Sequence, residues 1–382
     1  MAGIYIHVPF CSQRCTYCDF YFVTTAKSYA PYLRSLKREI AVQGHVFGER
    51  EKIDTIYFGG GTPSVLHGDD VTAILASLEK HFDISEVQEV TFELNPEDHS
   101  EEYLRYLRHL GVTRLSIGVQ SFYESDLRFM NRSHTAEQST RVIECARSCG
   151  FDNFSIDLIF GLPDQPPEYW AANLEKAIDL EVPHLSTYGL TIEEKTVLFK
   201  QIQRGAVTPP DESDIADRYR FTMTYLQNAG YEHYETSSFS LPSYRSLHNQ
   251  RYWEHRNYIG LGPSAHSFWW SGLPAQRWAN IRNLRRWQAL LEGRHAPIEF
   301  REELDLDTLA NEYIMLRLRT VDGLDLAALE HTYGVDLYDE RLTELAWLES
   351  EGYIRPIRND LVQLTDEGKL LTDLITSKLI TG

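Results

Sequence analysis

The sequence predicts an α/β protein, with a partial (β/α)6 barrel followed by a smaller winged-helix-like α+β domain. Short runs rich in β-branched and aromatic residues alternate six times with longer amphipathic stretches. Glycine-rich and polar motifs follow these runs directly, and the pattern changes to helices and a hairpin after about residue 300. A chain of 382 residues is long enough for one large barrel and a second unit.

The barrel elements follow one another in a regular order. The strand candidates are GIYIHV, DTIYFG, EVTFEL, TRLSIGV, NFSIDLIF and HLSTYGLT. The helix candidates, where apolar positions recur every three to four residues, lie at about 27–44, 65–81, 99–110, 135–149, 167–181 and 212–229. Six such units predict a parallel sheet that curls into a partial barrel.

Polar and reactive residues lie where the predicted strands end. In barrels of this kind the chemistry gathers at the carboxyl ends of the strands. The residues at these positions are Cys11 to Cys18 after the first strand, GGGTPS after the second, Glu93 ending the third, Gln120 after the fourth and Asp157 within the fifth. We therefore expect one site at one mouth of the barrel.

We divide the chain into a core barrel at 1–232, a connecting sheet at 233–298 and a C-terminal domain at 299–382. The connecting region is dense in Tyr, Trp, Arg and His and reads as a continuation of the sheet that carries a second site. Helical patterns after it precede YIRPIRNDLVQLTDEG, which reads as two short strands around an Asn-Asp turn. Residues 301–382 contain 18 Asp and Glu against 8 Lys and Arg, which favours a protein contact over DNA reading.

Composition narrows the class of protein. The net charge of −19 disfavours binding to phosphate backbones, so we do not expect nucleic acid as a partner. No apolar run approaches the roughly 20 residues that span a bilayer, so an integral membrane protein is not expected. The first residues carry neither a basic n-region nor a cleavable apolar stretch, which favours a cytoplasmic protein.

Three cysteines lie close together in CSQRCTYC: Cys11, Cys15 and Cys18. In a reducing compartment such a group favours a metal site over disulfides. Tetrahedral zinc needs a fourth protein ligand, such as His7. A four-iron cluster held by three thiolates leaves one iron open to a small molecule. Cys145 and Cys149, four residues apart on a predicted helix, are expected to be buried apolar residues.

CSQRCTYC resembles the C-x3-C-x2-C loop of the radical S-adenosylmethionine (radical SAM) enzymes. YIHVPFC, GGGTPS, RLSIGVQSF and IDLIFGLP resemble, in the same order, the group that contains oxygen-independent coproporphyrinogen III oxidase and the heme chaperone HemW. The similarity covers essentially the whole chain. It implies a [4Fe-4S] cluster on the three thiolates and SAM chelated to the open iron. It also implies that the reduced cluster can cleave SAM to a 5′-deoxyadenosyl radical.

The resemblance also implies a set of SAM contacts: Tyr5, Gly60, Gly61, Thr62, Glu93, Gln120, Arg132 and Asp157. The glycines allow close backbone approach, the carboxylates suit ribose hydroxyls or the sulfonium charge, and Arg132 suits the SAM carboxylate. Tyr5 and Gln120 could instead be core residues of the barrel. Arg132 and Asp157 could instead form a structural ion pair.

Three features separate members of this group. Phe20 stands where the decarboxylating oxidase carries a further cysteine, and the extension that precedes the oxidase's cluster loop has no counterpart here. The segment HNQRYW resembles the H-N-x-x-Y-W pattern associated with heme binding. An imidazole can ligate heme iron and aromatic rings can cover the porphyrin. The expected heme residues are His248, Asn249, Tyr252 and Trp253, with His266 as a competing axial ligand and a packed core histidine as the alternative for His248.

The leading hypothesis is a heme chaperone that delivers heme to hemoproteins such as respiratory cytochromes, built on a cluster and SAM scaffold. We expect no coproporphyrinogen III dehydrogenase activity, and any other enzymatic activity stays open. The alternatives are a radical SAM oxidase or methyltransferase acting on a tetrapyrrole, and a redox or iron sensor whose acidic C-terminal module binds partners. The sequence leaves the heme acceptor and a homodimer open.

Overall fold

The computed structural model describes residues 1–24, 29–97 and 100–380. Its centre is a curved sheet whose strand order, among the described residues, is β12-β11-β10-β9-β1-β2-β3-β4-β5-β6-β8-β7. The strands of the barrel are β1 (Ala2–Val8), β2 (Ile53–Gly60), β3 (Glu89–Leu94), β4 (Arg114–Gln120), β5 (Phe154–Phe160) and β6 (His184–Gly189). These six pair in chain order and are all parallel, so the predicted partial barrel is confirmed.

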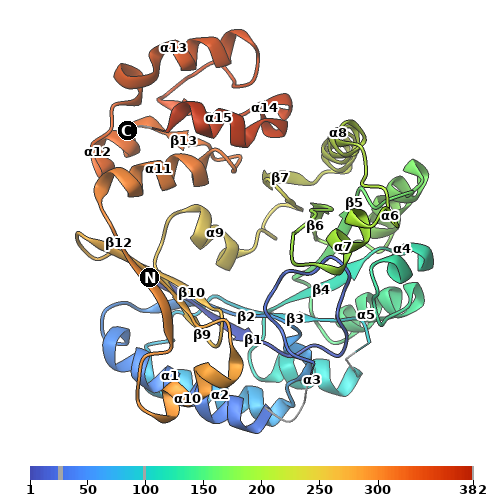
Figure 1. Cartoon of the computed structure of the whole chain (residues 1–382), viewed down its shortest axis with the longest axis vertical. Coiled ribbons are helices and arrows are strands. Elements are labelled where there is room, and N and C mark those ends of the chain that lie inside the picture. Colours follow the sequence, from blue (N-terminus) through green and yellow to red (C-terminus); the bar gives the residue numbers. More distant parts are fainter. Residues whose placement is uncertain (25–28, 98–99, 381–382) are drawn as a thin grey trace.

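Helices cover the convex side of this sheet (Figure 1). The barrel helices are α1 (Tyr29–Phe47), α2 (Gly68–His81), α3 (Glu101–His109), α4 (Glu124–Phe129), α5 (Ala136–Ser148), α6 (Pro167–Asp179), α7 (Val197–Gln203) and α8 (Glu212–Asn228). All six predicted helices that fall on this part of the chain are present, with ends within a few residues of those predicted, except that the predicted starts at 27 and 99 lie outside the described residues. α4 and α7 were not predicted, because each has only about two turns in which a pattern can repeat.

The two faces of the barrel strands carry different side chains. Ile4, Ile6 and Val8 of β1 belong to the apolar core shared with the helices. Tyr5 and His7, which alternate with them, point into the barrel because successive residues of a strand face opposite sides. The same alternation holds in the neighbouring strands, where the interior positions are largely polar. The residues that face the inside of the barrel are therefore mostly polar and suit contact with a polar ligand.

The region 233–298 extends the sheet at both ends, as expected. β7 (Glu232–Glu235) and β8 (Ser238–Ser240) lie beyond β6. β9 (Tyr258–Leu261) pairs with β1 in parallel, and β10 (His266–Trp269), β11 (Ala275–Asn280) and β12 (Ile298–Leu304) continue in antiparallel order. α10 (Leu284–Glu292) packs near α1, whereas α9 (Leu247–Trp253) lies on the concave side of the sheet (Figure 1).

A second apolar core lies in the C-terminal module. Its elements are α11 (Leu306–Arg317), β13 (Leu324–Asp325), α12 (Leu326–Tyr333), α13 (Leu337–Ser350), β14 (Leu361–Val362), α14 (Asp366–Leu370) and α15 (Thr372–Leu379). The predicted turn is present, because Asn359 and Asp360 both have positive φ. The two strands predicted around it do not pair as a hairpin: isolated bridges join Arg358 to Leu361 and Ile354 to Leu364, and β14 pairs with β13. The domain boundaries stay a prediction, and β12 runs across the one at 298/299. No helix in the described ranges combines the length and apolarity needed to cross a membrane.

Candidate cluster and cofactor site

The three cysteines lie on the loop that follows β1 at the carboxyl end of the barrel. The loop is closed at its base by two backbone hydrogen bonds, from Cys11 N to Val23 O (3.1 Å) and from Val23 N to Pro9 O (2.6 Å). Its centre is held by the Thr16 amide, which donates to Met130 O (3.1 Å). Cys11, Cys15 and Cys18 are all unpaired and partly exposed. A ligand at the barrel mouth can therefore reach all three thiols.

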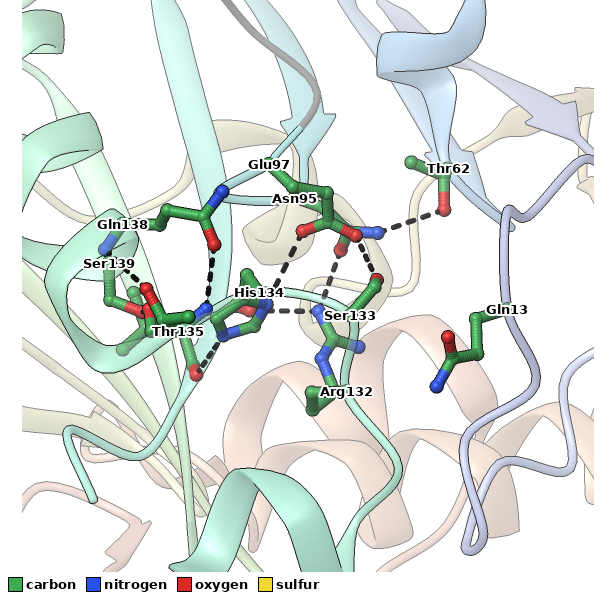
Figure 2. A network of polar contacts seen from close by, with 12 residues as sticks. Gln13, Thr62, Asn95, Glu97, Arg132, Ser133, His134, Thr135, Gln138 and Ser139 are labelled. Carbon is green, nitrogen blue, oxygen red and sulfur yellow. Dashed lines mark hydrogen bonds and ion pairs between the residues drawn. The ribbon is translucent and has the colours of Figure 1, made fainter. Parts of the chain in front are cut away.

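Side chains from two other loops contact the cysteines, and Asn95 joins these two side chains. Figure 2 shows Thr62, Asn95 and Arg132. Thr62 Oγ1 donates to Cys11 Sγ (3.5 Å), and Arg132 Nη1 donates to Cys15 Sγ (3.4 Å). Asn95 connects the two donors, because its Nδ2 donates to Thr62 Oγ1 (3.3 Å) and its Oδ1 accepts from Arg132 Nη2 (2.7 Å). This chain of contacts fixes two thiols relative to each other and provides donors that stabilise thiolates.

Burial favours the protonated form of two of the three thiols, Cys11 and Cys18. Burial raises the pKa of Cys11 to about 11, although the Thr62 hydroxyl and the nearby Arg132 charge act in the opposite direction. Burial likewise raises the pKa of Cys18. A metal centre must displace these protons, and the donors at Thr62 and Arg132 are already placed to compensate the resulting negative charge.

The residues fit a three-thiolate cluster better than a zinc ion. His7 is the sequence's candidate for a fourth zinc ligand, but its Nε2 is bonded to Tyr21 O (2.9 Å) and its Nδ1 to the Tyr5 hydroxyl (3.3 Å). In the described part of the chain, no three His, Cys, Asp or Glu side chains form a group that could hold one metal ion. Three thiols supply one ligand fewer than tetrahedral zinc needs, whereas three thiolates can hold a four-iron cluster and leave one iron open.

The glycine-rich loop after β2 lies against the base of the cysteine loop. Gly60 has a φ of 109°, and a Cβ there would lie 2.5 Å from the His7 ring. A Cβ on Gly61 would lie 2.7 Å from Val8 O and 2.8 Å from Phe10 O. Both glycines are therefore required by close packing against β1 and the start of the cysteine loop.

Glu93 connects the glycine loop to the barrel interior. Its Oε2 accepts from the Gly60 amide (3.2 Å), and its Oε1 accepts from the Tyr57 hydroxyl (2.8 Å). Burial raises the pKa of Glu93 to about 7, the Tyr57 hydrogen bond lowers it, and the nearby Asp157 raises it further. Tyr5 stacks on Tyr57, with ring centroids 6.0 Å apart. Tyr5, Gly60 and Glu93 are thus brought together, as the sequence predicted.

Asp157 of β5 and Gln120 of β4 are two further residues of the predicted SAM set. Burial raises the pKa of Asp157 to about 6, although Ser186 and the Arg114 and Arg132 charges lower it. Gln120 has a φ of 66° at a register shift between β4 and β5, which turns its side chain out of the regular strand pattern. Among the described residues, no ion pair joins Arg132 to Asp157, because Arg132 instead donates to Asn95 and to Gly118 O (2.9 Å).

A second network positions the chain next to Arg132 (Figure 2). The His134 ring is buried, its Nε2 is bonded to Val119 O (3.0 Å), and its Nδ1 lies 3.4 Å from Glu97 Oε2. The hydroxyl of Ser133 donates to Glu97. Burial raises the pKa of Glu97, but the contacts from His134 and Ser133 outweigh it and hold the pKa at about 2. Glu97 is therefore a carboxylate that fixes the loop carrying Arg132.

The HNQRYW segment forms α9 at the opposite, amino end of the barrel strands. Glu89, the first residue of β3, accepts from the amides of Leu247 and His248 (3.0 Å each), and Arg251 pairs with Asp54 of β2. The structure therefore places the predicted heme residues on the barrel floor, away from the cysteine loop.

His248 is fully buried in this position. Its Nδ1 is bonded to Thr55 Oγ1 (2.9 Å) and its Nε2 to the Tyr252 hydroxyl (2.9 Å). Asn249, expected to orient the imidazole, contributes its backbone amide to the Ser246 cap instead. His266, the competing candidate, has an exposed ring whose centroid lies 6.0 Å from that of Phe300.

Comparison with known proteins identifies the family. Residues 5–177 match the radical SAM superfamily, and residues 304–371 match the HemN C-terminal domain. The chain is 36% identical to the heme chaperone HemW of Lactococcus lactis, over 89% of this chain and 88% of that protein. The chain belongs to the HemW family. It is also 32% identical to the HemW of Escherichia coli, over 96% of this chain and 95% of that protein.

This HemW-family chain also resembles a solved structure over its whole fold. The coproporphyrinogen III oxidase HemN of Escherichia coli, described as a radical SAM enzyme, superposes with a TM-score of 0.85 and 25% identity, over 100% of this chain and 90% of that one. The predicted fold class and the predicted resemblance are both confirmed. Membership of the radical SAM superfamily implies a [4Fe-4S] cluster and SAM as cofactors.

Sequence reasoning missed three functional neighbours of the site: Tyr57, Asn95 and Glu97. Asn95 comes two residues after Glu93, just past the end of β3, so the rule that strand ends carry the chemistry could have found it. Tyr57 lies inside a strand and reads as an ordinary β-forming residue. Nothing in the local sequence indicates that Glu97 pairs with His134, 37 positions farther along the chain.

Proposed function

We propose that this chain binds heme and delivers it to hemoproteins such as respiratory cytochromes, on a scaffold that holds a [4Fe-4S] cluster and SAM. The observation that carries the proposal is the similarity to heme chaperones over nearly the full length, which includes both the barrel and the C-terminal module. The HNQRYW segment, with its imidazole and two aromatic side chains, supports heme as the cargo.

The cluster would be held by Cys11, Cys15 and Cys18, and when bound it supplies the electron that can break a carbon–sulfur bond of SAM. SAM would lie in the chamber beside it, where Glu93 and Asp157 face the ligand and Arg132 carries the charge that suits its carboxylate. The full set of proposed SAM contacts is Tyr5, Gly60, Gly61, Thr62, Glu93, Gln120, Arg132 and Asp157. Glu97 and Asn95 hold Arg132 in place.

Heme would contact α9 through His248, Tyr252 and Trp253. The chemistry of these side chains fits an axial ligand and a porphyrin face. In the present conformation, however, both ring nitrogens of His248 are bonded within the barrel. Iron ligation by His248 therefore requires α9 to release the ring, and the exposed His266 is the second candidate ligand.

A tetrapyrrole-directed radical SAM enzyme is the alternative function, and it is not favoured, because the relatives that match over most of the chain are named heme chaperones. Phe20 argues against a decarboxylating oxidase. It occupies the position at which that enzyme is expected to carry a further cysteine, and its side chain is 73% exposed at the loop surface. We therefore propose that the chain does not convert coproporphyrinogen III.

The last part of the proposal concerns the cellular location and the partners. We propose a cytoplasmic protein that meets heme-accepting proteins, some of them membrane-associated. The net charge of −19 argues against a nucleic-acid partner. The acidic C-terminal module is the part of the chain best suited to a protein contact.

The test is a hemin titration of the reconstituted chain, followed by transfer to an apo-cytochrome. We expect stoichiometric heme binding and transfer by the wild type. His248→Ala should weaken both, whereas His109→Ala, which removes an exposed histidine from α3, should retain both. A wild-type chain that binds no heme, or that binds heme without ever transferring it, would overturn the proposal.

A further inference from the structure

A single aromatic residue lies between the HNQRYW helix and the proposed SAM site. The Tyr57 ring packs against the His248 ring, with centroids 5.1 Å apart and an interplanar angle of 32°. The hydroxyl of the same tyrosine donates to Glu93 Oε1 (2.8 Å), and Glu93 Oε2 accepts from the Gly60 amide (3.2 Å). The barrel floor and the glycine loop at the mouth are thus connected through two side chains.

The His248 end of this connection is closely fitted. The ring is bonded on both sides, to Thr55 and to Tyr252, and it is fully buried. A Cβ on Gly3 would lie 3.2 Å from His248 Cε1, so the ring occupies a slot that exists because residue 3 has no side chain. Burial lowers the pKa of His248 to about 3, so the ring is neutral and each nitrogen is committed to one hydrogen bond.

An imidazole nitrogen that ligates iron cannot keep its hydrogen bond to a tyrosine or threonine hydroxyl. The ring is fully buried against β2 and Tyr252, so heme can reach it only if α9 shifts and carries the ring out of its slot. Tyr57 then loses the aromatic partner on one face and keeps only Tyr5, whose ring lies 6.0 Å away. The loss of this ring contact removes part of the packing that holds the Tyr57 hydroxyl on Glu93.

We propose that Tyr57 couples the two sites, so that heme on α9 weakens SAM binding at the barrel mouth. This inference rests on the proposed function. Tyr57 is a positioning residue, because it acts through Glu93 and the Gly60 backbone. Coupling between two ligands is reciprocal, so SAM weakens heme binding by the same factor. SAM would then favour heme release during delivery.

The test measures SAM affinity by equilibrium dialysis of the full, cluster-reconstituted chain, with and without one equivalent of hemin. In the wild type, hemin should weaken SAM binding about tenfold, the effect of losing one hydrogen bond to a charged group. Tyr57→Phe keeps the ring and removes the donor. Without hemin it should already bind SAM about tenfold more weakly than the wild type, and hemin should change that affinity little.

Tyr231→Phe is the matched control, since it removes another buried tyrosine hydroxyl, one that donates to Val182 O (2.5 Å). It should keep both the wild-type SAM affinity and the response to hemin. If hemin binds to the wild type but SAM affinity stays the same, the coupling is wrong while the proposed function stands. If Tyr57→Phe responds to hemin as the wild type does, Tyr57 does not carry the coupling. A failure to bind hemin at all overturns the proposed function and this inference with it.

Discussion

Gly61→Ala tests whether the glycine loop and the cysteine loop depend on each other. A Cβ at this position would lie 2.7 Å from Val8 O and 2.8 Å from Phe10 O, and both atoms belong to the backbone. Restoring an ordinary contact of about 3.5 Å requires a displacement of roughly 0.8 Å. The segment that must move ends directly before Cys11, and the Gly61 amide donates to Val8 O (2.8 Å) across the same junction.

We expect Gly61→Ala to destabilise the cluster-free chain by about 3 kcal/mol, the upper end of the cost of overpacking, because no flexible side chain can give way. The displaced loop should also retain less iron after anaerobic reconstitution. Urea denaturation followed by circular dichroism gives the first quantity, and iron and sulfide analysis gives the second.

Gly189→Ala, at the carboxyl end of β6, is the control. Its Cβ would meet the Phe160 side chain at 3.4 Å and the Ile215 side chain at 3.7 Å, both ordinary contacts, so stability should change by less than about 1 kcal/mol. If Gly61→Ala has wild-type stability and a full cluster, the glycine is not required by packing against the cysteine loop.

The remaining predictions concern single groups. Replacing any one of Cys11, Cys15 and Cys18 by alanine should prevent cluster retention. Cys145→Ala and Cys149→Ala should keep full iron and sulfide content, and equal loss in all five variants would contradict the assignment. The reconstituted chain should bind SAM without converting coproporphyrinogen III, and multiple turnovers detected by chromatography would contradict this. His248→Ala should change the absorption and resonance Raman spectra of bound heme without loss of iron–sulfur content; an unchanged spectrum would move the ligand to His266. Because the folded pKa of Glu93 is raised from 4.5 to about 7, the folded chain keeps a proton that the unfolded chain releases. Stability should therefore fall by up to about 3 kcal/mol between pH 4.5 and 7, and Glu93→Gln should remove that part of the pH dependence in urea denaturation.

The sequence alone determined the barrel and the cluster loop, because both are local. Strand and helix periodicities repeat within ten to twenty residues, so β1 to β6 and their long helices could be read directly. The close spacing of Cys11, Cys15 and Cys18 in the sequence predicts three thiolate ligands for one cluster without knowledge of the fold. The strand-end rule likewise placed Glu93 at the mouth, since parallel strands deliver their carboxyl ends to one edge.

Only the tertiary structure decided which distant residues meet. It showed that Arg132 contacts Asn95 and Cys15 and forms no pair with Asp157, and that His248 lies on the barrel floor with both ring nitrogens bonded. It also placed Tyr57 between His248 and Glu93. These contacts join positions 36 to more than 190 residues apart. No periodicity links such positions, because their distances are set by how β2, β3, β4 and α9 pack around one chamber and not by the local sequence at either end.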